Sequence, residues 1–357
     1  MTANSIFFKF RLKGNGIVNF DSKEQKEAIK KCGISLPDIK NSNYNFGKKS
    51  FYKDMDGNMT FVPKISAECL RNKIFNVVSN PAIIQLDAEM CDFLSHMSVL
   101  MRGWLFTYRN NFAIRRSSAV RITSAKEVSG AVPVLEIHST SENKELSETT
   151  MFYAESMGDT EYECKGVIDL KTLEFLTCDV ISDCRGFKED WVQGENALLN
   201  LMFKNRYGKI PYKLGYFTSI DSTLSDFFAE YGIKFDKDFV KQMIKEFLKW
   251  VLKLRIERAK GYVETTSLEI KFNENALRDL LNDDEGWITV NGDNLDSLDF
   301  DIKDYFKEVD DKDREENRKK LIGICEGIKA DIKTKKDEKK TSKANKKSGK
   351  SNTKEEE

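Results

Sequence analysis

Apolar and polar residues alternate in several separate stretches of the chain. From Ser5 to Lys13 every second position is apolar, and the intervening positions hold mostly Lys and Arg. A period of two is typical of a strand that buries one face, and here the other face would be basic. The sequence predicts further strands in four places: Ser117–Thr123, Thr160–Ile168, Leu214–Ile220 and Tyr262–Phe272.

Other stretches have the period of a helix. The clearest is Asp236–Arg258, in which a wide apolar stripe and a lysine at every fourth position follow different lines. Ser66 is a suitable N-cap for a helix that runs to Phe75, because its hydroxyl can accept a hydrogen bond from a free backbone N–H. Further helices are expected over Ser22–Cys32, Asp87–Phe106 and Trp191–Phe203.

Strands and helices in this order predict an α+β fold with helices on one face of an antiparallel sheet. Gly33–Pro63 has no clear period and is predicted to be a long loop or a small hairpin that turns at Asp56-Gly57. We expect three regions: a folded domain over residues 1–272, an acidic extension over 273–334, and a disordered Lys-rich tail over 335–357. One amphipathic helix is expected in the extension, through Leu321, Cys325, Ile328 and Ile332.

Charge is balanced overall but unevenly distributed. The chain holds 58 basic and 58 acidic residues, and the segment from Lys329 onward has 11 lysines against 6 acids. The other 328 residues therefore carry 47 basic and 52 acidic side chains. Any surface that binds nucleic acid must be a local basic stripe on a neutral to acidic body.

The residues that usually carry chemistry are sparse. Seven cysteines are scattered without a C-x-x-C pair, and the two histidines, His96 and His138, are far apart in sequence. No apolar run is long enough to span a bilayer, so we expect a reduced, cytoplasmic protein. Phosphate-binding loops, dinucleotide fingerprints and metalloprotease motifs are missing from the sequence. We therefore expect no enzyme activity, no cofactor and no metal.

An ordered set of motifs resembles the Cas-seven family, the CRISPR-associated backbone subunits of Cascade within the RAMP superfamily. It is most similar to the backbone subunit of the minimal variant type I-F system. The most specific stretch is Gly158-Asp-Thr-Glu-Tyr162 and its continuation to Phe175. The other motifs occur in matching order: Phe10–Phe20, Ile65–Arg71, Ser98-x-x-x-Arg102-Gly103, Arg115–Ser118 and Arg258–Tyr262.

The resemblance implies an RRM-like, ferredoxin-like palm, an antiparallel sheet with helices on one face, with a thumb hairpin inserted at 125–158. It implies a non-catalytic subunit that oligomerises along CRISPR RNA (crRNA) and presents it for pairing with target DNA. The implied partners are crRNA, target DNA, head-to-tail copies of the chain, and the Cascade subunits that cap the 5′ handle and process the 3′ handle. Two alternatives stay open, a metal-dependent RNase of the same superfamily and a stand-alone crRNA-binding mimic.

Candidate RNA contacts follow from the need for cations and backbone N–H groups beside phosphates. Glycine at 103 would let the backbone approach a phosphate that the Arg102 guanidinium reaches, although a helix C-cap followed by a surface arginine is the alternative. Arg71, Asn72 and Lys73 lie off the apolar face of their helix, and Arg109, Arg115 and Arg116 lie in or after a polar loop, so ordinary solvation is the alternative for these six. Arg258, Lys260 and Gly261 lie at a predicted helix C-terminus, where the helix dipole would also favour the two cations. Met151, Phe152 and Tyr153 are predicted to wedge between bases or to pack on a neighbouring subunit.

Overall fold

The computed structural model of the chain describes two compact units. Unit 1 comprises Met1–Lys213 and Ile233–Lys303, and unit 2 comprises Leu214–Gly232 and Asp304–Glu357. The residues described are 2–15, 49–53, 59–76, 83–108, 112–129, 134–140, 151–157, 159–178, 180–181, 184–185, 189–220, 229–258, 261–274, 285–310, 312–316, 319–320, 322–323 and 326.

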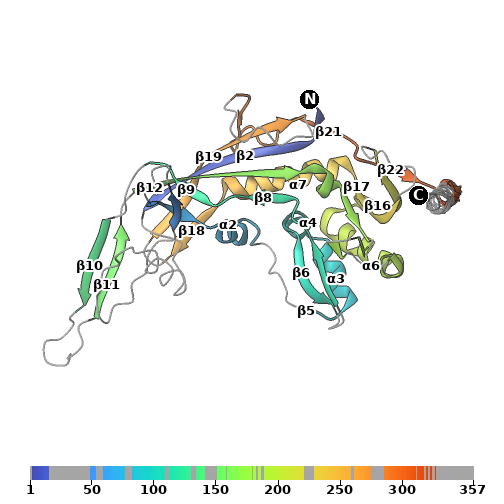
Figure 1. The fold of residues 1–357 in the computed structure, drawn as a ribbon, viewed down its shortest axis with the longest axis horizontal. Helices are drawn as coiled ribbons and strands as arrows, with labels where there is room; N and C mark the ends of the chain where they lie inside the picture. Colours follow the sequence, from blue (N-terminus) through green and yellow to red (C-terminus); the bar gives the residue numbers. More distant parts are fainter. Residues whose placement is uncertain are drawn as a thin grey trace, which may run out of the picture. The chain divides into compact units, whose positions relative to one another are not determined.

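Unit 1 contains, among its described residues, a nine-stranded antiparallel sheet (Figure 1). Its central strand β2 (Ser5–Asn15) lies between β12 (Asp159–Asp169) and β19 (Gly261–Asn273). The other strands are β18 (Arg255–Arg258), β9 (Ala125–Glu127), β8 (Val120–Ile122), β4 (Met59–Ile65), β3 (Lys49–Lys53) and β20 (Ile288–Thr289). The α+β class is therefore confirmed, as are the three long strands predicted from alternation.

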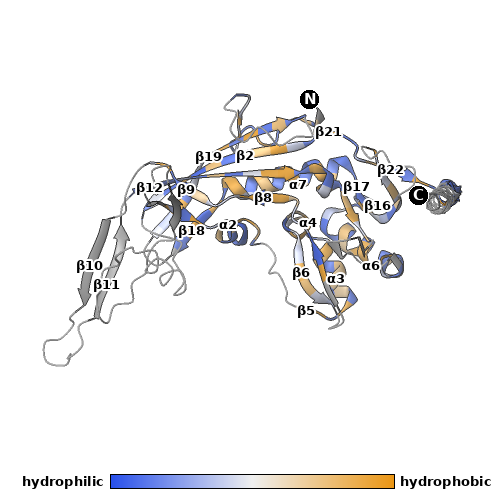
Figure 2. Cartoon of the chain, in the orientation of Figure 1, coloured by the Kyte–Doolittle hydropathy of each residue, from blue (hydrophilic) through white to orange (hydrophobic). Residues whose placement is uncertain are grey.

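The apolar positions of β2 form one wall of the core. Phe8 and Phe10 are buried, whereas Arg11 on the other face is exposed. Helix α7 (Lys237–Leu252) covers this wall, and its Phe247 ring meets Phe8 edge to face at 5.1 Å. In Figure 2, hydrophobic positions recur along β2, β12 and α7, which matches this packing. Burial of such aromatic surface is the main favourable term that holds a helix on a sheet.

Helix α2 (Ala67–Ile74) begins as predicted, because the Ser66 hydroxyl accepts a hydrogen bond from the Cys69 N–H at 3.3 Å. The helix buries Leu70 and Ile74. Phe75, its C-cap, stacks on Phe247 with ring centroids 5.8 Å apart. The polar side of α2 is therefore held at a fixed position beside α7.

The predicted helix Asp236–Arg258 extends too far. Helix α7 ends at Leu252, and Arg255–Arg258 form strand β18, which pairs with the start of β19 in a hairpin. Apolar residues at Leu254 and Ile256 are buried while Arg255 and Glu257 are exposed. This short alternation, stabilised by pairing with β19, prevails over continuation of the helix.

The predicted helical region Asp87–Phe106 is also wrong near its end. It consists of α3 (Asp87–Leu94) and α4 (Met97–Arg102), followed after Gly103 by strand β6 (Trp104–Tyr108). Strand β6 lies between β5 (Ile83–Ile84) and β7 (Phe112–Arg116) in a three-stranded sheet. Helix α6 (Glu189–Tyr207) packs on α3 and confirms the predicted helix at Trp191–Phe203.

Two hairpins fall within the segments predicted to be insertions. Strands β10 (Val134–Thr140) and β11 (Met151–Met157) pair antiparallel, inside the segment predicted to be an inserted hairpin. Strands β3 and β4 pair antiparallel with Lys53 opposite Met59, so the described residues at the end of Gly33–Pro63 form a hairpin. The predicted turn at Asp56-Gly57 and the predicted helix Ser22–Cys32 lie outside the described residues.

The beginning of the predicted acidic extension packs on the sheet of unit 1. Strand β20 pairs with β19, and Phe300 stacks on Phe272 with ring centroids 5.2 Å apart. The Lys245 ammonium donates to the Asp296 carbonyl at 2.7 Å, so a lysine of the α7 ridge serves an internal contact. Short strands β1 (Thr2–Ala3) and β21 (Asp301–Ile302) also pair, in parallel.

Unit 2 is smaller. Strand β16 (Tyr212–Ser219), which confirms the strand predicted at Leu214–Ile220, pairs antiparallel with β22 (Phe306–Val309). The Arg314 guanidinium lies over the Tyr216 ring at 3.7 Å, a cation–π contact. Residues 312–316 are helical, whereas Leu321, Cys325, Ile328, Ile332 and the tail from Lys335 lie outside the described residues.

The aromatic cluster around α7 yields a stability prediction. Phe247→Ala should lower the free energy of unfolding by about 3–5 kcal/mol, because it leaves a cavity between the helix and the sheet. Leu201→Ala, at a position of α6 that is 50% exposed, should cost less than about 1 kcal/mol. Urea unfolding of both variants measures the difference, and equal losses would show that α7 is not the centre of the core.

Candidate nucleic-acid interface

The polar side of α2 meets the end of α4 through two reciprocal hydrogen bonds. Nη2 of Arg71 donates to the backbone carbonyl of Arg102 at 2.6 Å. Nη2 of Arg102 donates to Oδ1 of Asn72, also at 2.6 Å. Each guanidinium is therefore oriented by the opposite helix, and three of the predicted RNA contacts lie together although Arg102 is 30 residues away from Asn72 in sequence.

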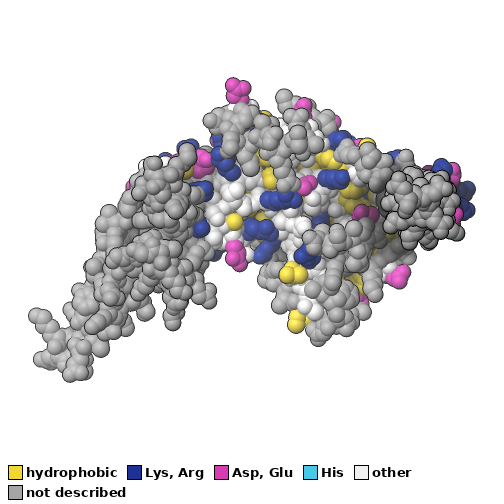
Figure 3. All heavy atoms as spheres, viewed as in Figure 1, with side chains coloured by type: hydrophobic (Ala, Val, Ile, Leu, Met, Phe, Trp, Pro, Cys, Tyr) yellow, Lys and Arg dark blue, Asp and Glu magenta, His cyan; other side chains and the backbone are white. Residues whose placement is uncertain are grey.

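These residues line a cavity of about 440 Å³. Its walls come from α2, the end of α4, the start of β6, and the end of β7 with the residues that follow it: Glu68, Arg71, Asn72, Arg102, Gly103, Trp104, Leu105, Arg116 and Ser118. We call this the α2–α4 pocket. In the space-filling view, Lys and Arg side chains gather in the area where Figure 1 draws α2 and α4 (Figure 3). The volume is within the range of ordinary ligand sites.

The electrostatics of the α2–α4 pocket favour an anion. Burial, and then the neighbouring charge of Arg102, lowers the pKa of the Arg71 guanidinium below its usual value. Among the described residues, no ion pair joins Arg71 or Arg102 to a carboxylate. Two guanidinium groups held close together would both be stabilised by a phosphate, which can accept several charge-assisted hydrogen bonds.

Gly103 has a structural reason to be glycine. Its φ is +72°, and its N–H donates to the Val99 carbonyl at 3.0 Å to end α4. A Cβ at this position would lie 2.5 Å from the carbonyl oxygen of Arg116. The helix C-cap alternative is therefore confirmed, and it is compatible with a binding role for Arg102, since that residue still lines the pocket.

Arg116 differs from the other cations of the pocket. It is 8% exposed, and its Nη2 donates to the backbone carbonyl of Thr172 at 2.5 Å. Its guanidinium also lies over the Trp104 ring at 5.6 Å. Arg116 was predicted to contact RNA or to lie in a solvated turn, but here its side chain is buried and held by a backbone carbonyl, although it still lines the pocket.

The structure does not bring every predicted contact to this pocket. Arg115 is exposed on β7, opposite Leu105, and Lys73 is exposed on α2, but neither lines the cavity. Arg258 and Gly261 pair in the β18–β19 hairpin, so the predicted helix C-terminus is wrong there. Met151, Phe152 and Tyr153 lie in β11, opposite Thr140, Ser139 and His138 of β10. Arg109 and Lys260 lie outside the described residues.

The basic face of β2 proves to be matched by acids on its neighbours. Lys13 pairs with Glu161 at 3.2 Å, and Arg11 pairs with Glu163 at 3.2 Å. Lys9 pairs with Glu269 at 3.0 Å. Sequence analysis missed this cross-strand ladder, although the acids that alternate along Thr160–Ile168 were a signal for it. The three cations of β2 on this face are therefore each balanced by a neighbouring carboxylate.

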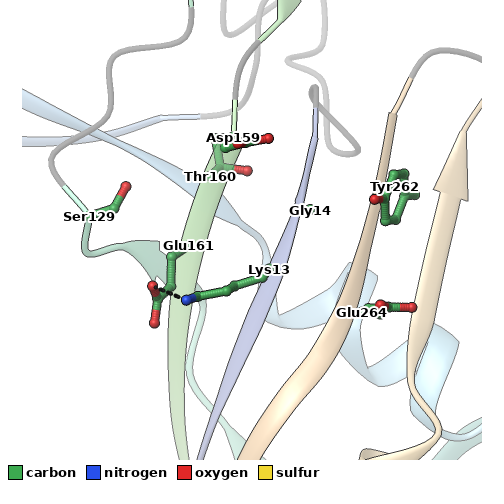
Figure 4. Close-up of a pocket in the computed structure, with 8 residues that line it drawn as sticks. All are labelled: Lys13, Gly14, Ser129, Asp159, Thr160, Glu161, Tyr262 and Glu264. Carbon is green, nitrogen blue, oxygen red and sulfur yellow. Dashed lines mark ion pairs between the residues drawn. The ribbon is translucent and has the colours of Figure 1, made fainter.

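A second cavity, of about 410 Å³, lies where β2, β12 and β19 run together (Figure 4). It is lined by Lys13, Gly14, Ser129, Asp159, Thr160, Glu161, Tyr262 and Glu264. Figure 4 shows the Lys13 ammonium paired with Glu161, so the other carboxylates leave this cavity acidic. It would repel a phosphate backbone, and it contrasts in this respect with the α2–α4 pocket.

The α3–α4 junction fixes the other end of α4. Arg206 of α6 donates to Asp92 Oδ1 at 2.7 Å, to Ser95 Oγ at 3.1 Å, and lies 2.9 Å from His96 Nδ1. Burial, and then the charge of Arg206, lowers the pKa of His96, while Asp92 opposes the shift. A neutral imidazole thus belongs to the native arrangement that positions α4.

An α+β sheet protein with a cationic pocket on a charge-matched body is a candidate nucleic-acid-binding protein. A family model described as "Type I-Fv CRISPR-associated protein Cas7fv-like" matches residues 3–294. The match spans well over half of the chain, so the chain belongs to this family and is a backbone subunit of a type I CRISPR effector complex. A comparison with curated proteins finds no match.

Solved structures give weak likenesses. One chain of a "CRISPR RNA-guided surveillance complex" is 12% identical, with 76% of this chain and 72% of that chain covered and a TM-score of 0.36. One from a "CRISPR RNA-guided surveillance complex, pre-nicking" is 8% identical, with 76% and 80% covered and a TM-score of 0.37. A chain of a "Type IV-B CRISPR Complex" is 9% identical, with 63% and 89% covered and a TM-score of 0.25. Such scores are too low to define a shared fold.

Two further observations apply to the described ranges. They contain no group of three or more His, Cys, Asp or Glu side chains placed to hold a metal ion. They also contain no helix with the length and apolar character needed to cross a membrane.

Gly103 can be compared with a second glycine of the same backbone conformation. Gly208, at the end of α6, also has φ +72°, but a Cβ there would meet nothing within 4 Å. Gly208→Ala should therefore cost only the left-handed strain of about 1–2 kcal/mol. Gly103→Ala should cost more, because it adds a steric clash with the backbone at Arg116. Thermal unfolding of both variants tests this, and equal losses would contradict a close approach at Gly103.

His96 predicts a dependence of stability on pH. Its pKa in the folded protein lies below the usual value of about 6.5, so the unfolded chain takes up more protons as the pH falls through this range. The contribution to the free energy of unfolding is fully present above about pH 6.5 and is lost below it. Urea unfolding at several pH values should show that His96→Gln reduces this loss. An unchanged loss in His96→Gln would contradict the assignment.

Proposed function

We propose that this backbone subunit binds crRNA at the α2–α4 pocket, where Arg71 and Arg102 hold a phosphate of the RNA. The observation that carries the proposal is the contrast between two sets of cations. Those on the outer face of β2 are each paired with a carboxylate, as in the Arg11–Glu163 pair at 3.2 Å. Those of the pocket are oriented by a carbonyl and an amide oxygen, which leaves their charge for an external anion.

Backbone recognition suits a subunit that must accept any guide sequence. A guanidinium group can donate two parallel hydrogen bonds to the oxygens of one phosphate, and such a contact does not depend on the base sequence. The zero net charge of the chain also implies that binding depends on a local site rather than on general attraction. In a guided complex, base pairing provides the sequence specificity while the protein holds the backbone.

We also propose that the sheet with α2 and α7 is an RRM-like palm and that the β10–β11 hairpin is its thumb. In support, the hairpin is inserted between β9 and β12, two strands that pair with each other in the main sheet. The chain can thus leave the sheet and return without disturbing its order. Met151, Phe152 and Tyr153, at the start of β11, are the residues that would wedge between bases or contact the next subunit.

In this proposal the chain is non-catalytic and forms a head-to-tail filament along crRNA, which it presents for pairing with target DNA. A heterologous contact that repeats along a linear RNA produces an open filament. Such a filament needs capping, and the proposed partners at its ends are the Cascade subunits that bind the 5′ handle and process the 3′ handle. Membership of a type I-Fv CRISPR-associated family supports assembly with other CRISPR-associated subunits in general.

Arg102→Ala tests the proposed site. The variant should bind guide-length RNA more weakly at every sequence, and the slope of log affinity against log salt should fall by about one unit, since one phosphate contact is lost. Arg11→Ala is the matched control, because it removes an equally charged side chain that is paired on the outer face of β2. Fluorescence anisotropy over a salt series measures both variants. A lower melting temperature of Arg102→Ala with an unchanged slope would instead assign Arg102 a structural role.

A further inference from the structure

Glu68 is a carboxylate in a pocket otherwise suited to anions. It lies on α2 one turn before Arg71 and Asn72, so the three residues share one side of the helix, and all three line the cavity. Glu68 is exposed, and no ion pair within the described ranges involves it. The nearby Arg71 guanidinium is directed to the Arg102 carbonyl instead. A carboxylate beside a phosphate site weakens phosphate binding by repulsion, unless the ligand also offers that carboxylate a hydrogen-bond donor.

We infer that Glu68 accepts a hydrogen bond from the ribose 2′-hydroxyl of the nucleotide whose phosphate lies on Arg71 and Arg102, and so makes the pocket select RNA over DNA. This inference rests on the proposed function. An ionised carboxylate only accepts hydrogen bonds, and within the sugar–phosphate backbone of RNA the 2′-hydroxyl is the donor. Deoxyribose lacks that donor, so a DNA strand in the same position brings phosphates to the carboxylate without any compensating bond.

The remaining wall of the pocket fits the same ligand. Leu105, at the start of β6, is 61% exposed although it is apolar, and it lines the cavity together with the two arginines. An apolar surface beside a phosphate site can pack against the sugar or base of the same nucleotide. The pocket therefore combines two cations for the phosphate, an acceptor for the 2′-hydroxyl and an apolar surface for the sugar or base of the same nucleotide.

The test compares RNA, single-stranded DNA and 2′-fluoro RNA of one sequence at one salt concentration. The wild-type protein should prefer RNA over both of the others, because fluorine keeps the RNA-like sugar but cannot donate a hydrogen bond. Glu68→Ala should reduce this preference about tenfold to hundredfold, the range expected for one hydrogen bond to a charged group. DNA binding should tighten, because the repulsion between carboxylate and phosphate is removed. Glu264→Ala, the control, removes an equal charge from the outer face of the sheet and should leave the preference unchanged.

Three results would overturn the inference. They are a wild-type protein that does not prefer RNA, a 2′-fluoro RNA that binds like RNA, and a Glu68→Ala variant that tightens RNA and DNA equally. The last result would assign Glu68 to the helix dipole of α2, which also favours an acid in the first turn. A failure of the proposed function can be told apart from a failure of this inference. If the proposed function were wrong, Arg102→Ala would leave RNA affinity and its salt slope unchanged.

Discussion

The reciprocal hydrogen bonds between α2 and the end of α4 are the interaction on which the candidate site depends. Each arginine satisfies a polar group of the other helix, Arg71 at the carbonyl of residue 102 and Arg102 at the amide oxygen of Asn72. Neither bond neutralises a guanidinium, so the two positive charges are held at fixed positions and kept available. Pre-orientation of this kind lowers the entropy cost of binding an anion, since the side chains are already ordered.

The rest of unit 1 serves to hold these two helix ends. Helix α2 is fixed by the aromatic contacts of Phe75 with α7, and α4 is fixed at one end by Arg206 and at the other by the close approach at Gly103. The main sheet has a different electrostatic character, because acids on β12 and β19 pair with the cations of β2. Charge matching on one surface and its absence on another give a protein of zero net charge a defined basic site.

Much of the fold could be predicted from local signals. Alternation identified the three long strands, and Ser66 identified the start of α2 with its capping bond. The errors come from long-range contacts. Arg255–Arg258 continue a helical pattern in sequence but pair with β19, and a strand replaces the helix after Gly103 because β5 and β7 are there to pair with it.

The site shows the same limit. Arg71, Asn72 and Arg102 were predicted individually, but their mutual hydrogen bonds depend on how two helices pack, which no local pattern specifies. Arg116 was predicted to face RNA, yet its partner is a carbonyl 56 residues further along the chain. Glu68 did not stand out in the sequence, since an acid in the first turn of a helix is ordinary. Its significance depends on the cations that the fold places beside it.

An arginine-specific modification footprint, read by mass spectrometry with and without guide-length RNA, tests the central claim most directly. Phenylglyoxal reacts with accessible guanidinium groups, so each arginine reports its own environment. We predict that RNA protects Arg71 and Arg102 and leaves the reactivity of Arg11 and Arg255, which are paired with acids elsewhere on the sheet, unchanged. Protection of Arg11 with no change at Arg71 and Arg102 would contradict the account and place the RNA on the outer face of the sheet.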